Sequence, residues 1–453
     1  MDGLCKLRSM GVMPVIRRKT EIFLVLALFF SLVGSVWAGA YLLSAHGDTA
    51  NGVKRTDGRT DGYARGNCAH CHEQHGVIGG VSNGGPYAFA LFSTNFDTSA
   101  SSAPYSASND VCFLCHGPSS VQEGGIINYD YSETYGGYTG GPSTILDVFN
   151  LVNSSSVASY HNLKDIYNFA KDNFSFFTEN SNPCVACHNP HLVKRIKTNN
   201  TDPATYTVVS LPSAHNSLWG DNSGEKMSDF TSSYQAPYYY NSSSSYEPGG
   251  TSTYNGSNLP DYVTFCTACH NASNTIYSSN LGRNLRQIDW ISGGGDSASG
   301  SPLPDKHGKN SATVSVHLKN PFASSQLGIT IGFVTSCTDC HEPHGSPNPF
   351  LIRREVNGTI VSISGTDSNQ LGYLCRACHK DDAAFGVSGG ENRWEYIHHI
   401  KDDYPYVEKQ CGGCHGMGGG GGGGKPPIPC LNCHKHGSDD SWAGYKATGR
   451  ICF

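Results

Sequence analysis

One five-residue pattern, C-x-x-C-H, recurs along this chain and places two thiols and an imidazole at a fixed spacing. The first copy stands in the stretch NCAHCHEQH, residues 67–75, where three histidines surround two cysteines. Numbered motif 1 to motif 8 in chain order, the copies begin at Cys68, Cys112, Cys184, Cys266, Cys337, Cys375, Cys411 and Cys430. Their second cysteines are Cys71, Cys115, Cys187, Cys269, Cys340, Cys378, Cys414 and Cys433.

This spacing is what covalent attachment of a c-type haem requires. Two thiols three positions apart can add to the two vinyl groups on one porphyrin edge, and the next residue then lies under the ring, where its imidazole binds the iron. A C-x-x-C pair is also half of a structural zinc site, and cysteines of an exported chain can form disulfides. Neither alternative explains a histidine after every pair. The sequence therefore predicts eight haems c, haem 1 to haem 8, with the proximal ligands His72, His116, His188, His270, His341, His379, His415 and His434.

Twelve further histidines are candidates for the second axial ligand. Three segments share one layout, in which a histidine 20 to 23 residues upstream precedes C-x-x-C-H-x-x-H and a second C-x-x-C-H follows. The upstream histidines are His46, His161 and His317, and those three residues after a proximal histidine are His75, His191 and His344. This internal repeat supplies two distal histidines for two haems, three times over.

The last histidine of C-x-x-C-H-x-x-H is predicted to bind a haem other than its own. Three residues reach about 10 Å at most, and the chain would have to pass round a porphyrin edge to close the same iron. His75, His191 and His344 are therefore expected to tie one haem to the next, with a solvated surface histidine as the alternative. His70 lies inside its own attachment loop and is expected to be exposed and unligated.

The last two motifs lie outside the repeat, so the distal ligands of haem 7 and haem 8 must come from other histidines. His215 is one favoured candidate, and His399 or His398 is the other. Adjacent residues on an extended segment point in opposite directions, so this histidine pair could serve two haems. His307 and His436 are expected to be solvated.

The type of axial ligand follows from the scarcity of methionine. Beyond residue 40 the chain has only Met227 and Met417, so methionine cannot be the general sixth ligand. Bis-histidine iron is therefore expected, and it implies low reduction potentials because methionine ligation raises them.

The elements that must position these ligands leave little trace in the sequence. Only 38% of the 453 residues are hydrophobic, glycine contributes 54, and polar stretches such as 231–258 lack apolar periodicity. Such a chain needs more than its own apolar side chains to fold, and porphyrin faces would supply the missing surface. The predicted fold is mostly coil with short helices and few short strands, wrapped around a chain of stacked haems.

The first 40 residues have the features of an export signal: a basic start, an apolar run and small residues for cleavage. An uncleaved membrane anchor is the alternative, because the apolar run 22–43 is long enough to span a bilayer. Cleavage would change the net charge from −6 to −9 and leave no membrane span, and no basic patch indicates binding of nucleic acid. The predicted organisation is a signal at 1–40, dihaem units at 41–160, 161–300 and 301–395, and a C-terminal dihaem segment with a poly-glycine linker at 396–453.

On these eight motifs and their histidines, the chain resembles the multihaem c-type cytochromes. Its tandem dihaem units and loops rich in Gly, Ser, Asn and Tyr resemble the filament-forming extracellular cytochromes of metal-reducing bacteria. The resemblance implies electron transfer without catalysis, between redox partner proteins or extracellular acceptors, after export to the cell surface or the periplasm. Three roles are open within this class: a filament subunit, whose head-to-tail heterologous contacts repeat without closing, a soluble periplasmic or surface carrier, and a component of an outer-membrane conduit.

A multihaem reductase, acting on nitrite, hydroxylamine or tetrathionate, is the alternative function. Such an enzyme needs at least one five-coordinate haem, which some families mark by replacing the motif histidine with lysine. All eight motifs of this chain end in histidine, so the easiest signature of an open site is missing.

Overall fold

A computed structural model describes six of the eight motifs and the segments around them. The described residues are 40–58, 62–73, 77–78, 81–82, 87–124, 144–153, 157–194, 207–226, 260–290, 307–308, 319, 335–357, 359–363, 371–378 and 436.

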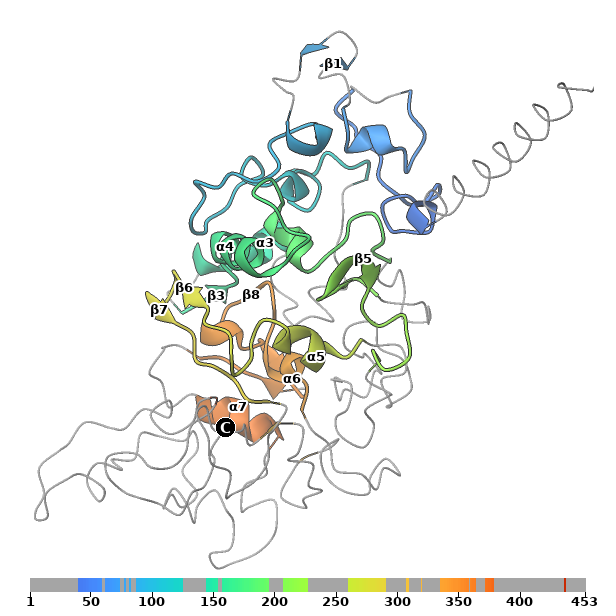
Figure 1. Ribbon diagram of the computed structural model, residues 1–453. Coiled ribbons are helices and arrows are strands. Elements are labelled where there is room, and N and C mark those ends of the chain that lie inside the picture. Colours follow the sequence, from blue (N-terminus) through green and yellow to red (C-terminus); the bar gives the residue numbers. More distant parts are fainter. Residues whose placement is uncertain are drawn as a thin grey trace, which may run out of the picture.

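Short helices joined by long coil make up most of the described chain, as the composition predicts (Figure 1). The α-helices are α3 (Ile145–Phe149), α4 (Leu163–Asn173), α5 (Tyr262–Thr267), α6 (Cys337–Cys340) and α7 (Leu371–Cys378). The 3-10 helices are η1 (Cys68–His70), η2 (Ala88–Ala90), η3 (Val111–Leu114), η4 (Leu151–Asn153), η5 (Pro183–Ala186) and η7 (Pro349–Leu351).

The strands are short and pair only in twos within the described residues. Antiparallel pairs join β1 (Val77–Ile78) to β2 (Val81–Ser82), β4 (Ser210–Leu211) to β5 (Ala214–Leu218), β6 (Tyr277–Ser278) to β7 (Arg283–Asn284), and β9 (Glu355–Val356) to β10 (Thr359–Ile360). The fifth pair joins distant segments, β3 (Ser159–Tyr160) and β8 (Gly345–Ser346). This pair fastens the second repeat segment to the third.

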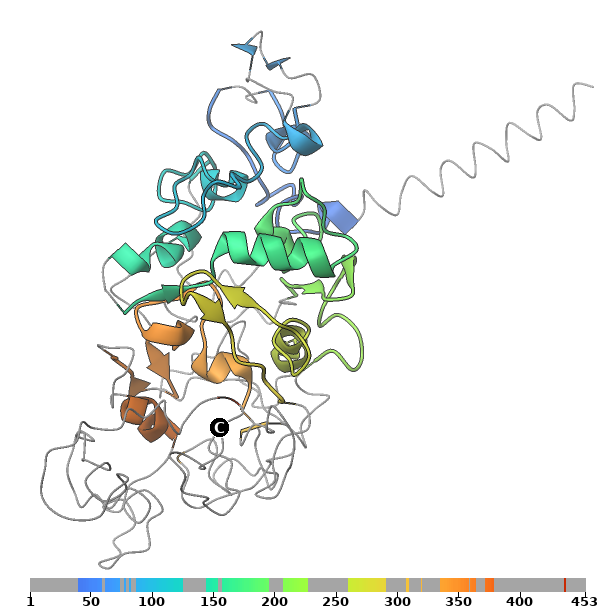
Figure 2. The ribbon, with the colours of Figure 1, turned by 60° about the vertical axis from the view of Figure 1, so that its left-hand side comes forward.

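The described segments follow one another in space in nearly the order of the sequence. Residues 40–124 lie at one end, 144–226 in the middle, and α6 and α7 towards the other end, in both views (Figures 1 and 2). The elements of the yellow segment 260–290 lie between the green and the orange ones (Figure 2). The chain therefore builds a column in which consecutive motifs become neighbours.

The longest helix, α4, is positioned by an N-terminal cap and by one apolar face. The side chain of Asn162 accepts hydrogen bonds from the backbone N–H groups of Lys164 (2.9 Å) and Asp165 (3.2 Å), two donors that the first turn leaves free. The buried face of the helix carries Leu163, Tyr167 and Ala170. These residues recur at helical spacing, so α4 lays one stripe on the core.

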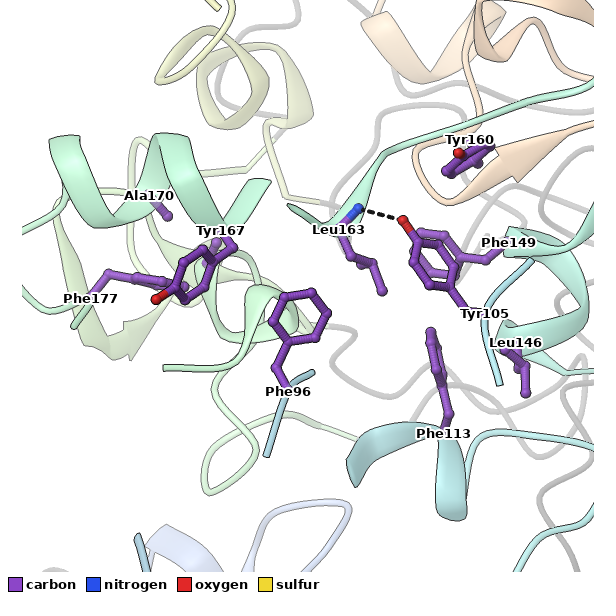
Figure 3. Packing of buried hydrophobic residues seen from close by; sticks show 11 residues of the cluster. Phe96, Tyr105, Phe113, Leu146, Phe149, Tyr160, Leu163, Tyr167, Ala170 and Phe177 are labelled. Carbon is purple, nitrogen blue, oxygen red and sulfur yellow. Dashed lines mark hydrogen bonds between the residues drawn. The ribbon is translucent and has the colours of Figure 1, made fainter. Parts of the chain in front are cut away.

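An aromatic core forms in the middle of the column from the chain's own side chains. Tyr105 lies at its centre, with its ring edge-to-face against Phe149 and Tyr160 at centroid distances of 6.1 and 5.9 Å (Figure 3). Phe113 is 1% exposed and contacts both Tyr105 and Phe149. Apolar side chains from segments 96–113 and 144–186 thus pack together, and only those on α4 recur at helical spacing.

None of the helices in the described ranges is long and apolar enough to cross a membrane. The apolar run at 22–43 lies almost wholly outside those ranges, so the predicted signal or anchor stays a prediction.

Candidate functional site

The C-x-x-C-H motifs fold into single helical turns wherever all five residues are described. In each, the backbone N–H of the histidine donates to the carbonyl of the first cysteine four residues earlier. The donors are His72 (2.8 Å), His116 (2.8 Å), His188 (2.9 Å), His270 (2.9 Å) and His341 (3.0 Å). One helical turn places residues i, i+3 and i+4 on the same face, so both thiols and the imidazole face the same side.

Polar side chains just upstream hold several of these turns at their N-termini. Asn67 accepts from the N–H of Ala69 at 2.9 Å in motif 1. Asp110 and Asn182 play the same role in motifs 2 and 3, where each accepts from the first cysteine's N–H at 2.8 Å. Such caps satisfy backbone donors that a short helix cannot pair internally.

The described cysteines are free thiols. None of the twelve cysteines in the described ranges takes part in a disulfide. Within each motif they sit on one side of a tight turn, which suits attachment of both to one ring. The disulfide alternative raised by the sequence therefore finds no support among motifs 1 to 6.

Each fully described motif histidine faces a second imidazole at nearly the same distance. The ring centroids are 6.0 to 6.2 Å apart in all five cases, with interplanar angles from 13° to 62°. The pairs are His72 with His191, His116 with His46, His188 with His344, His270 with His161, and His341 with His436.

This spacing fits one metal ion between the two rings of each pair. Two imidazoles that bind a metal from opposite sides, each nitrogen about 2 Å from it, place their ring centroids about 6 Å apart. Direct stacking of two rings on each other needs a much smaller separation. The donor set at motifs 1 to 5 therefore fits a haem iron held between the motif histidine and a distal histidine.

Hydrogen bonds fix which nitrogen of three motif imidazoles remains free. Nδ1 of His72 contacts the carbonyl oxygen of Phe89 at 2.9 Å, and Nδ1 of His188 contacts that of Val208 at 2.7 Å. Nδ1 of His341 is in the same way 2.9 Å from the carbonyl of Phe350. A carbonyl only accepts, so each Nδ1 carries the proton and each Nε2 keeps a lone pair for a metal.

Two of the distal histidines, His46 and His161, are oriented by the neighbouring repeat segment. Nδ1 of His46 donates to the carbonyl oxygen of Pro190 at 2.7 Å, and Nδ1 of His161 donates to that of Pro343. Each proline directly precedes the histidine that ends C-x-x-C-H-x-P-H. The short segment that ends each C-x-x-C-H-x-P-H therefore places its own histidine against one motif and orients the distal histidine of the next.

Burial keeps four of the motif imidazoles neutral. It lowers the pKa of His116 and of His270 to about 3, with nearby imidazoles adding to the shift. It lowers the pKa of His188 and of His341 to about 4. A metal ligand must be the unprotonated ring, so this environment suits ligation at neutral pH.

Consecutive motifs meet through their cysteines, from motif 1 to motif 6. The thiols of Cys112 and Cys184 lie within 4.8 Å of each other, and those of Cys266 and Cys337 are within hydrogen-bonding reach. At the other three junctions, the thiols are close enough to interact electrostatically: Cys71 with Cys115, Cys187 with Cys269, and Cys340 with Cys375. Neighbours in sequence are thus neighbours in space.

The expected exposure of His70 is wrong, and the expected role of His215 is not tested. His70 is fully buried rather than exposed. Its Nε2 donates to the carbonyl of Ala64 at 2.9 Å and its Nδ1 accepts from the N–H of Arg55 at 3.3 Å, so it offers no lone pair to a metal. His215 stacks on Phe176 at 4.9 Å, while the last two motifs it was assigned to lie outside the described residues.

His436 is the paired residue that sequence reasoning assigned to solvent. It is half-buried. Its ring centroid lies 6.1 Å from that of His341 and 6.2 Å from that of Trp290. The signal that could have found it is the sequence C-L-N-C-H-K-H, in which a second histidine again follows a motif histidine closely. The backbone carbonyl of His307 accepts a hydrogen bond from the hydroxyl of Thr335 at 3.4 Å.

Several predicted ligands lie outside the described residues and stay predictions. They are His75, His317, His379, His398, His399, His415 and His434, together with Cys411, Cys414, Cys430 and Cys433. The predicted unit boundaries likewise stay predictions.

Comparison with protein families finds one match, to the family described as "Doubled CXXCH motif", over residues 333–384. This segment contains motifs 5 and 6. No curated protein and no solved structure matches the chain. The match agrees with the attachment turns and supports a multihaem c-type cytochrome that binds haem c covalently and transfers electrons.

Proposed function

We propose that this protein carries electrons through eight bis-histidine haems c arranged in the order of their motifs. The five imidazole pairs, each 6.0 to 6.2 Å apart, are the observation that carries this proposal. Haem c supplies reversible one-electron chemistry at its iron. The chain's own contribution is to attach the rings, orient their axial imidazoles and set the spacing between neighbours.

Two axial imidazoles leave an iron no open position, so such a haem passes electrons and binds no substrate. The carbonyls that hold Nδ1 of His72 and His188 support this arrangement, because they direct Nε2 towards the ring partner. In the absence of methionine ligation, the potentials are expected to be low. The protein is accordingly proposed not to be an enzyme.

Continuity between haems is supported by the contacts between consecutive motifs. The thiols of motifs 2 and 3 lie within 4.8 Å of each other and those of motifs 4 and 5 are within hydrogen-bonding reach, while at the other three junctions from motif 1 to motif 6 thiols interact electrostatically. Because each cysteine is joined to a porphyrin edge after attachment, close cysteines imply close ring edges. The proposed path therefore runs along the column, through haem 1 to haem 6 in order.

The experiment that tests this function is a spectroscopic count of haems and spin states in the purified full chain. Mass spectrometry and a haem assay are expected to give eight haems per chain. The ferric protein is expected to be entirely low-spin, and the reduced protein not to bind carbon monoxide. A high-spin haem that binds carbon monoxide or nitrite would instead support the reductase alternative.

The proposed setting is extracellular, after export through the N-terminal segment, with redox proteins or extracellular acceptors as partners. We further propose head-to-tail assembly into filaments. His191 faces motif 1, and Pro190 orients His46, which faces motif 2. His75 holds the equivalent sequence position after motif 1, and residues 1–67 contain no C-x-x-C-H for it to face, which supports this idea. Electron micrographs of native material that show only single particles would contradict assembly.

A further inference from the structure

Two neighbouring attachment turns share one buried carboxylate. Asp110 precedes motif 2 by two residues and is fully buried. Its carboxylate lies with the thiols of Cys112 and Cys184 in a group whose ligand atoms are all within 4.8 Å of one another. These two sulfurs belong to different motifs, so the carboxylate stands where haem 2 and haem 3 would meet.

The hydrogen bonds of Asp110 bridge the two turns. Its Oδ1 accepts from the N–H of Cys112 at 2.8 Å and from the side-chain amide of Asn182 at 2.9 Å. Asn182 in turn accepts from the N–H of Cys184 at 2.8 Å and donates to the carbonyl of Asn95 at 2.8 Å. A continuous path of side chains thus joins the first cysteine of motif 2 to the first cysteine of motif 3.

Within the described ranges, the hydrogen-bond partners of this carboxylate include no cation. They are neutral donors, including the Cys184 thiol at 3.8 Å. Burial raises the pKa of Asp110 to about 6, and the hydrogen bonds from Asn182 and Cys112 oppose that shift. The group is therefore ionised at pH 8, and attachment would turn both thiols into uncharged thioethers beside it.

A fixed negative charge near an iron favours the ferric state, because oxidation adds a positive charge. Net charge, hydrogen bonding and burial are the terms by which a protein sets haem potentials. In a water-poor site the interaction is screened less than at the surface. One carboxylate between two rings acts on both.

We propose that Asp110 is a positioning residue shared by haem 2 and haem 3, which holds both attachment turns in register through Asn182 and lowers the reduction potentials of both haems. This inference rests on the proposed function. It assigns to the junction of motifs 2 and 3 an electrostatic role that the C-x-x-C-H motifs themselves do not contain.

The test compares Asp110→Asn with the wild type as full chains carrying their haems. Asparagine keeps the shape and an oxygen for the Cys112 N–H, but removes the charge. Redox titration at pH 8, followed by absorption, is expected to show the part of the curve that belongs to two haems shifted to more positive potentials. All haems remain low-spin. Asp97→Asn is the matched control, because Asp97 also caps a turn but is only partly buried, and its titration curve should match the wild type.

A second variant separates position from charge. Asn182→Ala breaks the bridge and keeps the carboxylate, so the magnetic coupling between haem 2 and haem 3 is expected to change in the ferric spectrum. If Asp110→Asn is not recovered with its full haem content, Asp110→Ser supplies another neutral cap for the same comparison.

The outcomes are distinguishable from those that test the proposed function. A wild-type protein with high-spin haem contradicts the proposed function itself. A wild type that is entirely low-spin, with a titration curve unchanged in the neutral variants of Asp110, overturns only this inference. An equal shift in Asp97→Asn would also overturn it, because burial at the junction would then be irrelevant.

Discussion

The imidazole of His191 lies parallel to that of His72, with an interplanar angle of 13° and a centroid distance of 6.0 Å. His191 comes only three residues after His188, whose own partner is His344 at 6.1 Å. The two histidines of one C-x-x-C-H-x-x-H segment therefore face different partners. His191 of the second repeat segment thus faces the motif histidine of the first, and His344 of the third faces that of the second.

Replacing His191 by alanine is expected to remove the second axial ligand of haem 1 and to leave both axial ligands of haem 3 in place. The variant loses the imidazole opposite His72, so one haem equivalent becomes high-spin in the ferric state and binds carbon monoxide when reduced. Electron paramagnetic resonance and difference absorption spectra measure both effects. His344→Ala is expected to open haem 3 in the same manner.

The control for these variants is His70→Gln. Both ring nitrogens of His70 are occupied by backbone groups, so its replacement is expected to lower stability without any high-spin signal. A high-spin signal in His70→Gln, or a fully low-spin His191→Ala, would contradict the assigned pairing.

His436→Ala is expected to open haem 5. His436 faces His341 at 6.1 Å and no other histidine pairs with His341 among the described residues. One haem equivalent should become high-spin. His436→Met is the informative companion, because a thioether ligand restores the low-spin state and raises the potential of that one haem. Unchanged spectra of the His436→Ala protein would show that His436 is not a ligand, as its sequence context predicted.

The cysteines and the motif histidines were readable from sequence because their spacing is set by covalent chemistry. C-x-x-C-H needs only one helical turn, and a local hydrogen bond from His72 to Cys68 closes it. The coil-rich fold was likewise predictable, since few segments carry a periodic apolar pattern. These features depend on contacts between residues close in the chain.

The partners of the motif histidines depend on distant contacts, and sequence alone left them open. Nothing local shows that His46 faces His116, or that the carbonyl of Pro190 orients it. His70 was expected at the surface because it lies in an attachment loop, yet Arg55 and the turn at Ala64 cover it. The aromatic core around Tyr105 was missed because its members come from distant segments, most of them short and without a periodic pattern, apart from those on α4.

Arg55→Leu is expected to destabilise the protein by about 3–5 kcal/mol. The guanidinium of Arg55 is buried, 3.2 Å from Glu73, whose side chain is also buried, and 3.7 Å above the ring of Phe92. Removing it leaves the Glu73 carboxylate buried without its cation. Chemical unfolding followed by circular dichroism measures the loss.

The pair of Arg65 with Glu123, whose side chains are 24% and 44% exposed, provides the control for that buried pair. Arg65→Leu is expected to cost less than about 1 kcal/mol, because solvent screens the pair. The double variant Arg55→Leu/Glu73→Leu should recover part of the loss. Equal costs for Arg55→Leu and Arg65→Leu would show that burial does not matter at Arg55.

Tyr105→Phe is expected to cost about 1–3 kcal/mol without altering the haem spectra. The hydroxyl of Tyr105 accepts from the N–H of Leu163 at 3.0 Å, at the buried start of α4 (Figure 3). Phenylalanine keeps the ring contacts and leaves that donor unpaired. Tyr63→Phe, at an exposed position, should change stability by less than about 0.5 kcal/mol. A Tyr105→Phe variant as stable as the wild type would mean that water replaces the hydroxyl.

Glu355→Gln is expected to stabilise the protein above pH 7 and to have little effect below pH 4.5. Burial raises the pKa of Glu355 from 4.5 to about 7, and Arg353 partly opposes the shift. Between these values the folded state keeps a proton that the unfolded state releases, so this group makes stability fall as pH rises from 4.5 through 7. Glutamine removes that penalty, worth about 2–3 kcal/mol at pH 8. Unfolding by urea at pH 5 and pH 8 measures the difference; Glu179→Gln, at an exposed position, should show none, and an equal gain at both pH values would refute the assignment.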